Sequence, residues 1–275
     1  SMPELPEVET IARTLSDKIT NRKIVNIDVK LPRLIKWPSF YEFKALLYNK
    51  TILNLTRRGK YLLFHLDNDL VMVVHLRMTG QFSYSTSKPP QEKHDHIIIT
   101  FDDNSTLVYS DKRTFGTFYV LPHEELWRIA SLHSLGKEPL SEEFTFEYFK
   151  DNIQDKKGLI KPILLNQTII AGLGNIYVDE SLALAKIDPE RICNSLNNKE
   201  LKNLYNAINT SIAKGIENRG TTFSDYRDGE GNKGDNQNSL HVYGRANQPC
   251  YNCKTLIQKK KVAGRSSHYC PNCQK

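Results

Sequence analysis

The chain has 275 residues, of which 39% are hydrophobic, and this length suits one large domain or two ordinary ones. No apolar run reaches the length of a membrane span and no signal peptide is present, so we expect a soluble intracellular protein. The net charge of +7 resides in residues 241–275, which contain seven Lys and Arg and no Asp or Glu. Such a local positive field indicates a polyanionic partner, most simply nucleic acid, although a solvated basic tail is the alternative.

The start of the chain predicts a helix. Apolar residues recur there at helical spacing on one face: Val8, Ile11, Ala12, Leu15 and Ile19. Pro6 suits the first turn, where its missing N–H costs nothing. The residues just before Pro6 would then lie near a helix N-terminus, which favours anions.

Short segments rich in β-branched residues and separated by turn signals predict six strands. They span residues 23–30, 51–58, 60–66, 70–76, 94–101 and 106–111. Because these segments follow one another without intervening helices, they predict an antiparallel β-sandwich and not a βαβ series. We assign this domain to residues 1–135.

The second half of the chain reads as helical. The patterns at 144–153, 158–165, 175–186 and 198–219 predict four helices. Pro139 and the acidic stretch after it predict a linker at 136–146, followed by a helical domain at 147–240. The glycine-rich turn "AGLGN" leads into a helix at Asn175, a pattern typical of phosphate sites but also of an ordinary helix stop. Residues 224–239 are rich in glycine and polar side chains and predict a mobile loop.

Four of the five cysteines predict a zinc site in residues 241–275. Cys250 and Cys253 form one CxxC pair and Cys270 and Cys273 another, with 16 residues between the pairs. Each pair places two thiolates on one turn, and four thiolates fill a tetrahedral shell, so one structural zinc ion is expected. Two disulfides are the alternative, which the spacing and the intracellular character disfavour. Cys193 is expected to be an ordinary, partly buried thiol.

Seven motifs in order along the chain resemble the formamidopyrimidine-DNA glycosylase family of base-excision repair. They are "PELPEVE", "RRGKYL", "HLRMTG", "DKRTFG", "AGLGNIYVDE", "VYGR" and the cysteine hairpin with "KVAGR". The resemblance implies an α+β fold: an N-terminal β-sandwich with an N-terminal helix, then an all-α helix–two-turns–helix domain that ends in a zinc-finger β-hairpin. It also implies a DNA glycosylase and abasic-site lyase that acts on double-stranded DNA. The expected lesions are oxidised purines, 8-oxoguanine and formamidopyrimidines, and the strand would be cleaved by β,δ-elimination.

The resemblance gives catalytic roles to four residues. A terminal proline nitrogen is a secondary amine that can attack the sugar C1′ and form a cationic iminium, so Pro3 is the expected nucleophile. Glu4 is the expected proton donor to the sugar ring. Lys60 would contact phosphate and assist β-elimination, and Arg265 would assist the second elimination.

Further residues are expected to handle DNA. Because a base inside the duplex must be flipped out before attack, Met78, Arg113 and Phe115 are expected to fill the gap, with core packing as the alternative for Met78. The expected DNA contacts, each with a solvated surface side chain as the alternative, are His75, His94, Arg113, Lys156, Lys161 and Asn175. Tyr226 is expected in the lesion pocket, under a loop that recognises the base through backbone N–H groups. Glu7 is expected in the same pocket, with a charge that complements the helix N-terminus as the alternative. In that loop Ser224 and Asp225 stand where many relatives carry Arg first.

Ser1 and Met2 resemble residues added in cloning. With Met2 attached, the Pro3 nitrogen is a tertiary amide without a lone pair free to attack. The chain that retains Ser1-Met2 is therefore expected to bind DNA but to be inactive.

Two other functions are open at this point. The endonuclease VIII family prefers oxidised pyrimidines, but it usually begins "PEGPE" and lacks the "HLxMxG" element. A non-enzymatic DNA-binding protein would need only the zinc hairpin and the helical domain, and the presence of Pro3, Glu4 and Lys60 argues against it. We expect a cytoplasmic, nucleoid-associated monomer.

Overall fold

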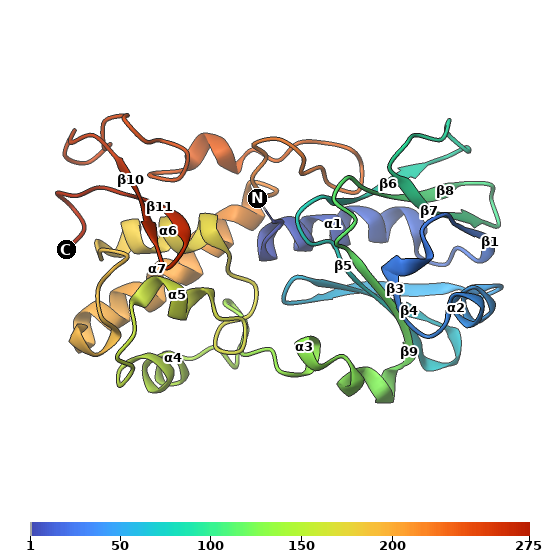
Figure 1. The fold of residues 1–275 in the computed structure, drawn as a ribbon, viewed down its shortest axis with the longest axis horizontal. Helices are drawn as coiled ribbons and strands as arrows, with labels where there is room; N and C mark the ends of the chain where they lie inside the picture. The colour runs from blue at the N-terminus through green and yellow to red at the C-terminus, as the bar shows by residue number, and fades with distance from the viewer. Residues whose placement is uncertain (1) are drawn as a thin grey trace. The chain divides into compact units, whose positions relative to one another are not determined.

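A computed structural model describes residues 2–275, whose contacts divide the chain into two compact units. The first unit holds the N-terminal residues through Ser134 together with Arg219–Gly234. The second holds Leu135–Asn218 and Asp235–Lys275. Figure 1 follows the chain through both units, from blue at the N-terminus to red at the C-terminus. The fold class is α+β, as the sequence predicted.

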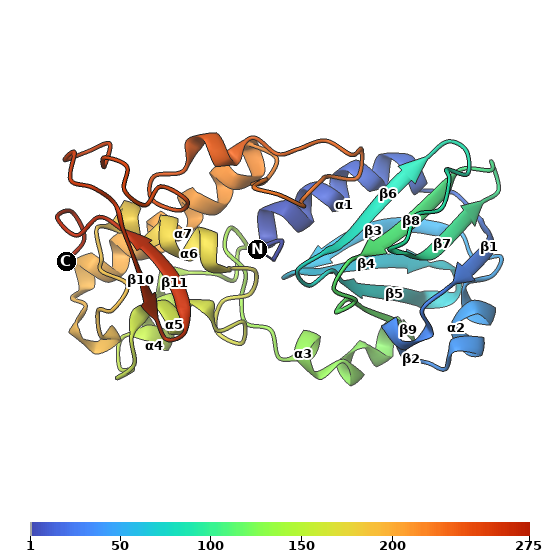
Figure 2. The same cartoon turned by 45° about the horizontal axis from the view of Figure 1, so that its top comes forward.

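The first unit is a sandwich of two sheets (Figure 2). One sheet is antiparallel, in the order β1 (Ile24–Val29), β7 (Asp95–Phe101), β8 (Thr106–Asp111) and β6 (Gly80–Ser85). The other has the order β2 (Ile35–Trp37), β9 (Thr117–Pro122), β5 (Leu70–His75), β4 (Tyr61–Leu66) and β3 (Ile52–Arg58). All six predicted strands are confirmed.

The predicted sandwich is antiparallel except at one edge, where the unpredicted strand β2 pairs with β9 in parallel. β2 has three residues and follows directly on a 3-10 turn, so it is too short to show any periodicity. The sequence patterns also missed β6, β9 and two short helices, α2 (Phe40–Leu47) and α3 (Ala130–His133). The 3-10 helices of the chain are η1 (Pro32–Leu34), η2 (Asp67–Asp69), η3 (His123–Arg128), η4 (Cys193–Ser195) and η5 (Asn236–Ser239).

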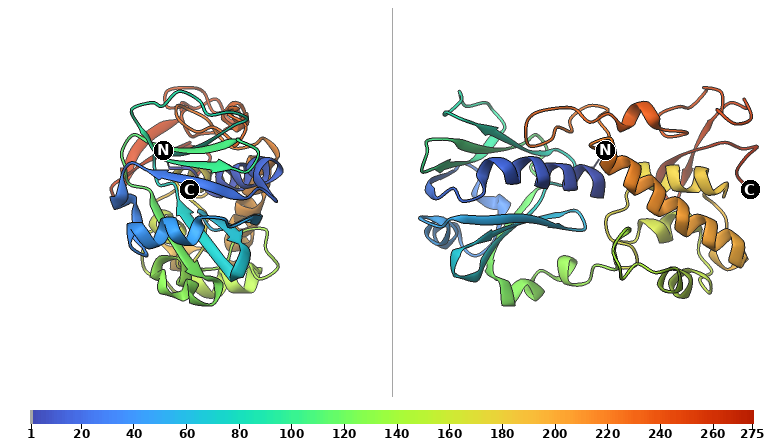
Figure 3. Two further views of the ribbon diagram at one scale, coloured as in Figure 1. Left: turned by 90° about the vertical axis from the view of Figure 1, so that its right-hand side faces the viewer. Right: turned by 180° about the vertical axis from the view of Figure 1, so that it is seen from behind.

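The predicted N-terminal helix is confirmed as α1 (Leu5–Ile19), which runs between the two layers of strands (Figure 3). Its apolar face joins the core formed by both sheets, and Leu15 and Ile19 are fully buried there. Each large apolar side chain buried in this way contributes about 1.5–3 kcal/mol. The start of α1 is therefore a fixed point in the first unit.

The second unit contains the four predicted helices and the hairpin. These are α4 (Phe146–Ile153), α5 (Ile160–Leu165), α6 (Asn175–Ala185), α7 (Asn198–Glu217), β10 (Gln258–Val262) and β11 (Arg265–Tyr269). Helix α6 contacts both α7 and β11, so it joins the helices to the hairpin. Among residues 2–275, no helix is long and apolar enough to cross a membrane.

Residues 219–234 belong to the first unit, whereas the sequence grouped them with the helical domain. Two backbone hydrogen bonds to α1 explain the difference. Thr221 N donates to Glu7 Oε2 at 3.0 Å, and Gly229 N donates to Thr14 Oγ1 at 2.7 Å. A loop read as polar and mobile is thus tied to the helix that opens the chain.

Candidate active site and DNA-contact residues

Pro3 and Glu4 lie buried at the N-terminal end of α1. Glu7, also buried, holds this end in place, because its Oε1 accepts a hydrogen bond from Glu4 N at 2.8 Å. Its Oε2 accepts the bond from Thr221 N. Glu7 therefore fixes both the backbone of the expected catalytic residues and the base of the 219–234 loop.

Gly220 completes this arrangement. Its φ of +85° is strained for residues with a side chain, and a Cβ would lie 3.0 Å from both Glu7 Cγ and the Tyr226 ring. Burial and the nearby Glu7 charge raise the pKa of the Tyr226 phenol, which donates to Arg219 O at 3.1 Å. A glycine is what lets Tyr226 pack against Glu7.

Lys60 lies beside the expected nucleophile. Arg57 joins β3 to α1 through an ion pair with Glu9, 2.8 Å from Nε to Oε1, and its Nη1 donates to Gly59 O at 3.0 Å. These contacts set the turn before Lys60, whose Nζ lies 3.9 Å from Met2 Sδ. The ammonium is thus one residue away from Pro3.

His75, at the end of β5, is an uncharged donor. Burial, followed by the charges of Arg77 and Lys60, lowers the pKa of the imidazole to about 3. Its Nδ1 accepts a hydrogen bond from Arg77 N at 3.0 Å, so the ring proton is on Nε2. The ring also packs edge-on against Tyr61, with centroids 4.7 Å apart. The side chain can give one neutral hydrogen bond to a phosphate oxygen.

Met78, Arg113 and Phe115 lie on two neighbouring loops, residues 76–79 and 112–116, which we call the wedge loops. Arg113 Nη1 lies 3.1 Å from Met78 Sδ, and Phe115 is 59% exposed. Met78 is half-buried, whereas Met72 on β5 is the methionine that packs in the core. The structure thus brings together the three residues expected to enter the base stack.

Asp111, which the sequence analysis missed, organises both wedge loops. Its Oδ1 accepts from Thr79 Oγ1 at 2.6 Å and from Thr114 N at 3.0 Å. Its Oδ2 accepts from Tyr109 Oη at 2.7 Å and from Gly116 N at 2.9 Å. The carboxylate is 1% exposed, so these four donors replace its water.

Pro3, Met78 and Tyr226 line one small cavity of the first unit. Gln81 of β6 and Asp225 and Arg227 of the loop also line it, and its volume is about 10 Å³. That is about the space of one water molecule, and a purine base is many times larger. The three predicted residues therefore line one cavity that is too small for a base in this conformation.

Asn175 and Arg265 meet in the second unit through the backbone of the hairpin. Asn175 begins α6, and its Nδ2 donates to Ser266 O at 2.9 Å. Arg265, the residue before Ser266, is exposed at the start of β11. The start of α6 therefore contacts the hairpin at the residue next to Arg265.

Lys161, which was predicted to contact DNA, lies inside the second unit. Its side chain is fully buried, and its Nζ donates to Asp179 Oδ1 at 2.7 Å, to Ser267 Oγ at 2.7 Å and to Ser266 O at 2.9 Å. Because all three ammonium protons have partners inside the second unit, none is left for a phosphate. Lys161 instead fastens α5 and α6 to the hairpin.

Two other residues predicted to contact DNA, His94 and Lys156, lie nearer the surface. His94, in the first unit, is half-buried and lines a polar groove beside β6 and β8. Lys156 follows α4 in the second unit and is also half-buried. Both side chains stay predictions as DNA contacts.

The four hairpin cysteines have the arrangement of a zinc site. Their sulfur atoms all lie within 4.8 Å of one another, with Cys250 and Cys273 3.9 Å apart and Cys253 and Cys270 3.5 Å apart. Tetrahedral Zn–S bonds of about 2.3 Å place sulfur atoms about 3.8 Å apart, whereas a disulfide needs about 2.05 Å. The residues fit one structural zinc ion and no disulfide.

Comparisons with known proteins agree along the whole chain. Family models match the formamidopyrimidine-DNA glycosylase N-terminal domain at residues 2–118, its H2TH domain at 135–227 and the zinc finger found in FPG and IleRS at 247–275. The formamidopyrimidine-DNA glycosylase of Pelotomaculum thermopropionicum is 47% identical over 274 residues, which cover 100% of this chain and 99% of the relative. That of Heliobacterium modesticaldum is 44% identical, with 100% of both chains covered.

The chain belongs to the formamidopyrimidine-DNA glycosylase family. It is accordingly a DNA-repair enzyme with a zinc finger. Among solved structures, a variant of the Lactococcus lactis enzyme with Fapy-dG-containing DNA has a TM-score of 0.94 at 40% identity, over 99% of this chain and 100% of that one. The wild-type Lactococcus lactis enzyme with oxidised-pyrimidine DNA has a TM-score of 0.93 at 40% identity, with the same coverage.

Because the chain belongs to a DNA glycosylase family, base excision can be used to test whether Asp111 holds the wedge loops in place. Asp111→Asn replaces one accepting oxygen by an NH2 group that faces hydrogen-bond donors. We expect it to lower the free energy of unfolding by about 1–3 kcal/mol and to slow excision of a damaged base. Urea unfolding and single-turnover excision measure the two effects. Asp102→Asn, at an exposed ion pair with Arg22, is the matched control and should change neither; equal behaviour of the two variants would contradict the role of Asp111.

The zinc site gives a second test. Cys270→Ala is expected to lose the single equivalent of zinc and to lower the thermal midpoint, because a structural zinc ion contributes folding free energy directly. Metal analysis and thermal unfolding provide the measurements. Cys193→Ala, which removes a thiol outside the cluster, should keep the metal. Full zinc content in Cys270→Ala would show that the fourth thiolate is not a ligand.

Proposed function

We propose that the enzyme excises oxidised purines from double-stranded DNA and cleaves the strand, with the Pro3 nitrogen as nucleophile. The observation that carries the proposal is the placement of Pro3 and Glu4 at the fixed end of α1, with Lys60, Met78 and Tyr226 around them. The Lactococcus lactis relatives were crystallised with Fapy-dG and abasic-site DNA, which supports the same substrates here.

The chemistry follows from the amine. A terminal secondary amine has a pKa of about 8, so a useful fraction is neutral at pH 7. Its lone pair attacks C1′, the base leaves with the glycosidic electrons and takes up a proton, and opening of the sugar ring gives an iminium. Glu4, buried next to Pro3, is proposed to protonate the ring oxygen as it leaves.

The iminium makes strand cleavage possible. Because the cation withdraws electrons, the C2′ proton becomes acidic, and its loss expels the 3′ phosphate by β-elimination. A second elimination expels the 5′ phosphate. Lys60 beside Met2 can assist the first step, and Arg265 on the hairpin is proposed to assist the second.

The wedge loops supply what base extrusion requires. Met78 and the exposed Phe115 ring can enter the stack, and the Arg113 guanidinium can donate to the orphaned cytosine. Phosphate contacts would come from Lys60, from the neutral His75 and, in the second unit, from Asn175 and Arg265. Such contacts make binding fall steeply with salt.

The test uses protein with a free Pro3 and four duplexes, which carry 8-oxoguanine opposite cytosine, a formamidopyrimidine, an oxidised pyrimidine or no lesion. Borohydride reduces the iminium and traps the covalent complex. We expect trapping on the two purine lesions and none on undamaged DNA. The absence of trapping on every lesion would refute the proposal.

Oxidised pyrimidines are a second candidate substrate. The observation in their favour is the Lactococcus lactis complex with oxidised-pyrimidine DNA. The pyrimidine duplex in the same experiment decides the question. Equal trapping on the pyrimidine and purine duplexes would add oxidised pyrimidines to the substrates. Trapping mainly on the pyrimidine duplex would make oxidised pyrimidines the main substrate in place of purines.

A further inference from the structure

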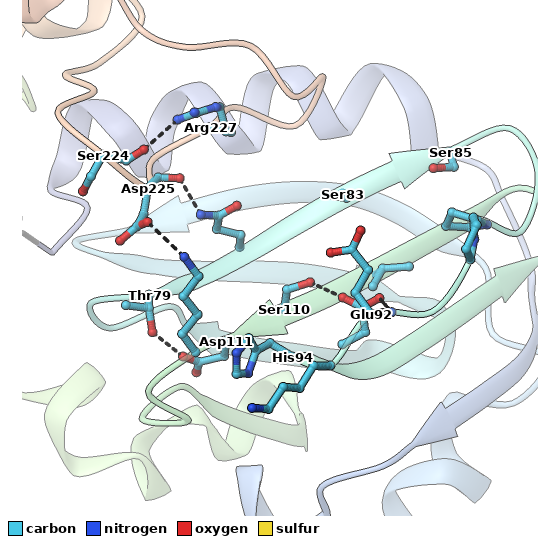
Figure 4. Close-up of a pocket in the computed structure, with 17 residues that line it drawn as sticks. Thr79, Ser83, Ser85, Glu92, His94, Ser110, Asp111, Ser224, Asp225 and Arg227 are labelled. Carbon is cyan, nitrogen blue, oxygen red and sulfur yellow. Dashed lines mark hydrogen bonds and ion pairs between the residues drawn. The ribbon is translucent and has the colours of Figure 1, made fainter.

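Asp225 fastens the loop beside Pro3 to the strands of the first unit, in addition to the buried Tyr226, which packs in the core. Gln81 Nε2 on β6 donates a hydrogen bond to Asp225 O, and Lys112 Nζ lies 3.7 Å from Asp225 Oδ1. Figure 4 shows Asp225 reaching toward the strands of the first unit, with Ser224 and Arg227 beside it. We call Gln81, Lys112 and Asp225 the latch.

The two halves of the loop are held unequally. Residues 228–234 are anchored: Gly229 N donates to Thr14 Oγ1, and Asp228 Oδ1 accepts from Glu230 N and Asn232 N at 2.9 Å each. Residues 224–227 instead border a groove of about 680 Å³ (Figure 4), which is lined largely by polar side chains of β6, β8 and the turn before β7. With open polar space on one side, Asp225 and Arg227 can move away from Pro3 while Tyr226 and the anchored half stay in place.

The latched half lines the small cavity at Pro3. Asp225, Tyr226 and Arg227 line that cavity together with Gln81, and its volume of about 10 Å³ is too small for a base. A flipped purine therefore needs Asp225 and Arg227 to move aside. Such a movement has to break the contacts of Asp225 with Gln81 and Lys112.

Lys112 connects the latch to DNA, because it stands next to Arg113 in the wedge loop. Its side chain is 66% exposed, and an exposed ion pair at 3.7 Å is weak. A phosphate that approaches the wedge loop competes with Asp225 for the same ammonium group, because it is also an anionic hydrogen-bond acceptor. Wedge insertion and release of the loop are thus coupled through one lysine.

We propose that Gln81 and Lys112 are positioning residues that hold Asp225 and keep the Pro3 cavity too small for a base until the wedge loop meets DNA. The proposal rests on the proposed function, since it orders two steps of that reaction. Base entry follows wedge insertion. An abasic site brings no base to admit, so its cleavage does not depend on the latch.

Two variants loosen the latch without touching the residues expected to contact DNA. Asp225→Asn removes the ion pair and leaves Lys112 free, and Gln81→Leu removes the hydrogen bond to the loop backbone. At saturating DNA, we expect single-turnover excision of 8-oxoguanine to rise about 2- to 5-fold in each variant, the range that weak contacts of this kind span. Cleavage of abasic-site DNA should stay unchanged. Glu230→Gln, an exposed acidic residue in the anchored half, is the matched control and should alter neither rate.

A second measurement reports on the latch without DNA. Trypsin cleavage after Arg227 requires the latched half to open, so both variants should be cut there faster than the unchanged protein, and Glu230→Gln should not. Fragment masses identify the cut. Unchanged excision of 8-oxoguanine in both variants, or equal slowing on 8-oxoguanine and abasic DNA, would overturn the proposal. If no form of the protein excises a base, the proposed function fails, and unchanged trypsin cleavage at Arg227 then overturns the latch separately.

Discussion

Protein whose Pro3 is the free N-terminal residue is expected to be trapped by borohydride on 8-oxoguanine DNA, whereas the chain that retains Ser1 and Met2 is not. With Met2 joined to it, the Pro3 nitrogen is an amide whose lone pair is delocalised into the carbonyl. Loss of a nucleophile costs about 10³-fold or more in rate. Denaturing gels after reduction measure the covalent complex, and product gels measure strand cleavage.

DNA binding separates this effect from misfolding. Met2 is only half-buried and α1 is fixed by its apolar face, so the longer chain should bind a lesion duplex with an affinity close to that of the free-Pro3 form. A Pro3→Gly form with a free N-terminus keeps an amine and should retain measurable trapping. Equal trapping by the chain with and without Ser1-Met2 would move the nucleophile to another amine, with Lys60 the first candidate.

Lys161→Met is expected to lower the free energy of unfolding of the second unit by about 3–5 kcal/mol, because it leaves Asp179 charged, buried and without its lysine. Chemical denaturation provides the measurement. Lys156→Met, at the half-buried lysine that was also predicted to contact DNA, should stay within about 0.5 kcal/mol of the parent.

A double variant sharpens this test. Lys161→Met combined with Asp179→Asn removes both charges and should recover part of the loss, because the penalty comes from the unpaired carboxylate. The opposite result for Lys161→Met would be normal stability with a salt dependence of DNA binding reduced by about one phosphate contact. That result would restore Lys161 as a direct DNA contact.

Periodicity predicted the elements whose burial is one-sided and long enough to repeat. α1, α4 and α7 have such patterns, whereas β4, β5 and α6 are buried along most of their length and were recognised from their apolar content. β6, read as "GQFSYS", was missed because its outward face borders the polar groove and carries Gln81 and Ser83. β2 has three residues and forms only because it pairs with β9. β9 is distant along the chain, so no local sequence pattern predicts this pairing.

Site residues could be predicted where they belong to a sequence motif. They could not be predicted where their role depends on contacts that only the fold creates. Pro3, Met78 and Tyr226 were named from motifs, and they line one cavity. Asp111 was passed over although it stands in "DKRTFG", because its four hydrogen bonds join residues that only the fold brings together. Lys161 carried a usable signal: it lies between the buried Ile160 and Leu164 of α5, and a lysine on an apolar helix face is usually paired inside the protein.

Ser266 O accepts hydrogen bonds from both Asn175 and Lys161, so one carbonyl of the hairpin sets the position of the α6 terminus. The hairpin in turn depends on four thiolates, two of which, Cys253 and Cys273, are partly exposed. Oxidants that convert guanine to its damaged forms also oxidise thiolates. Oxidation of these thiolates would therefore release the metal and loosen the start of α6, so oxidising conditions are expected to inactivate the enzyme through its zinc site.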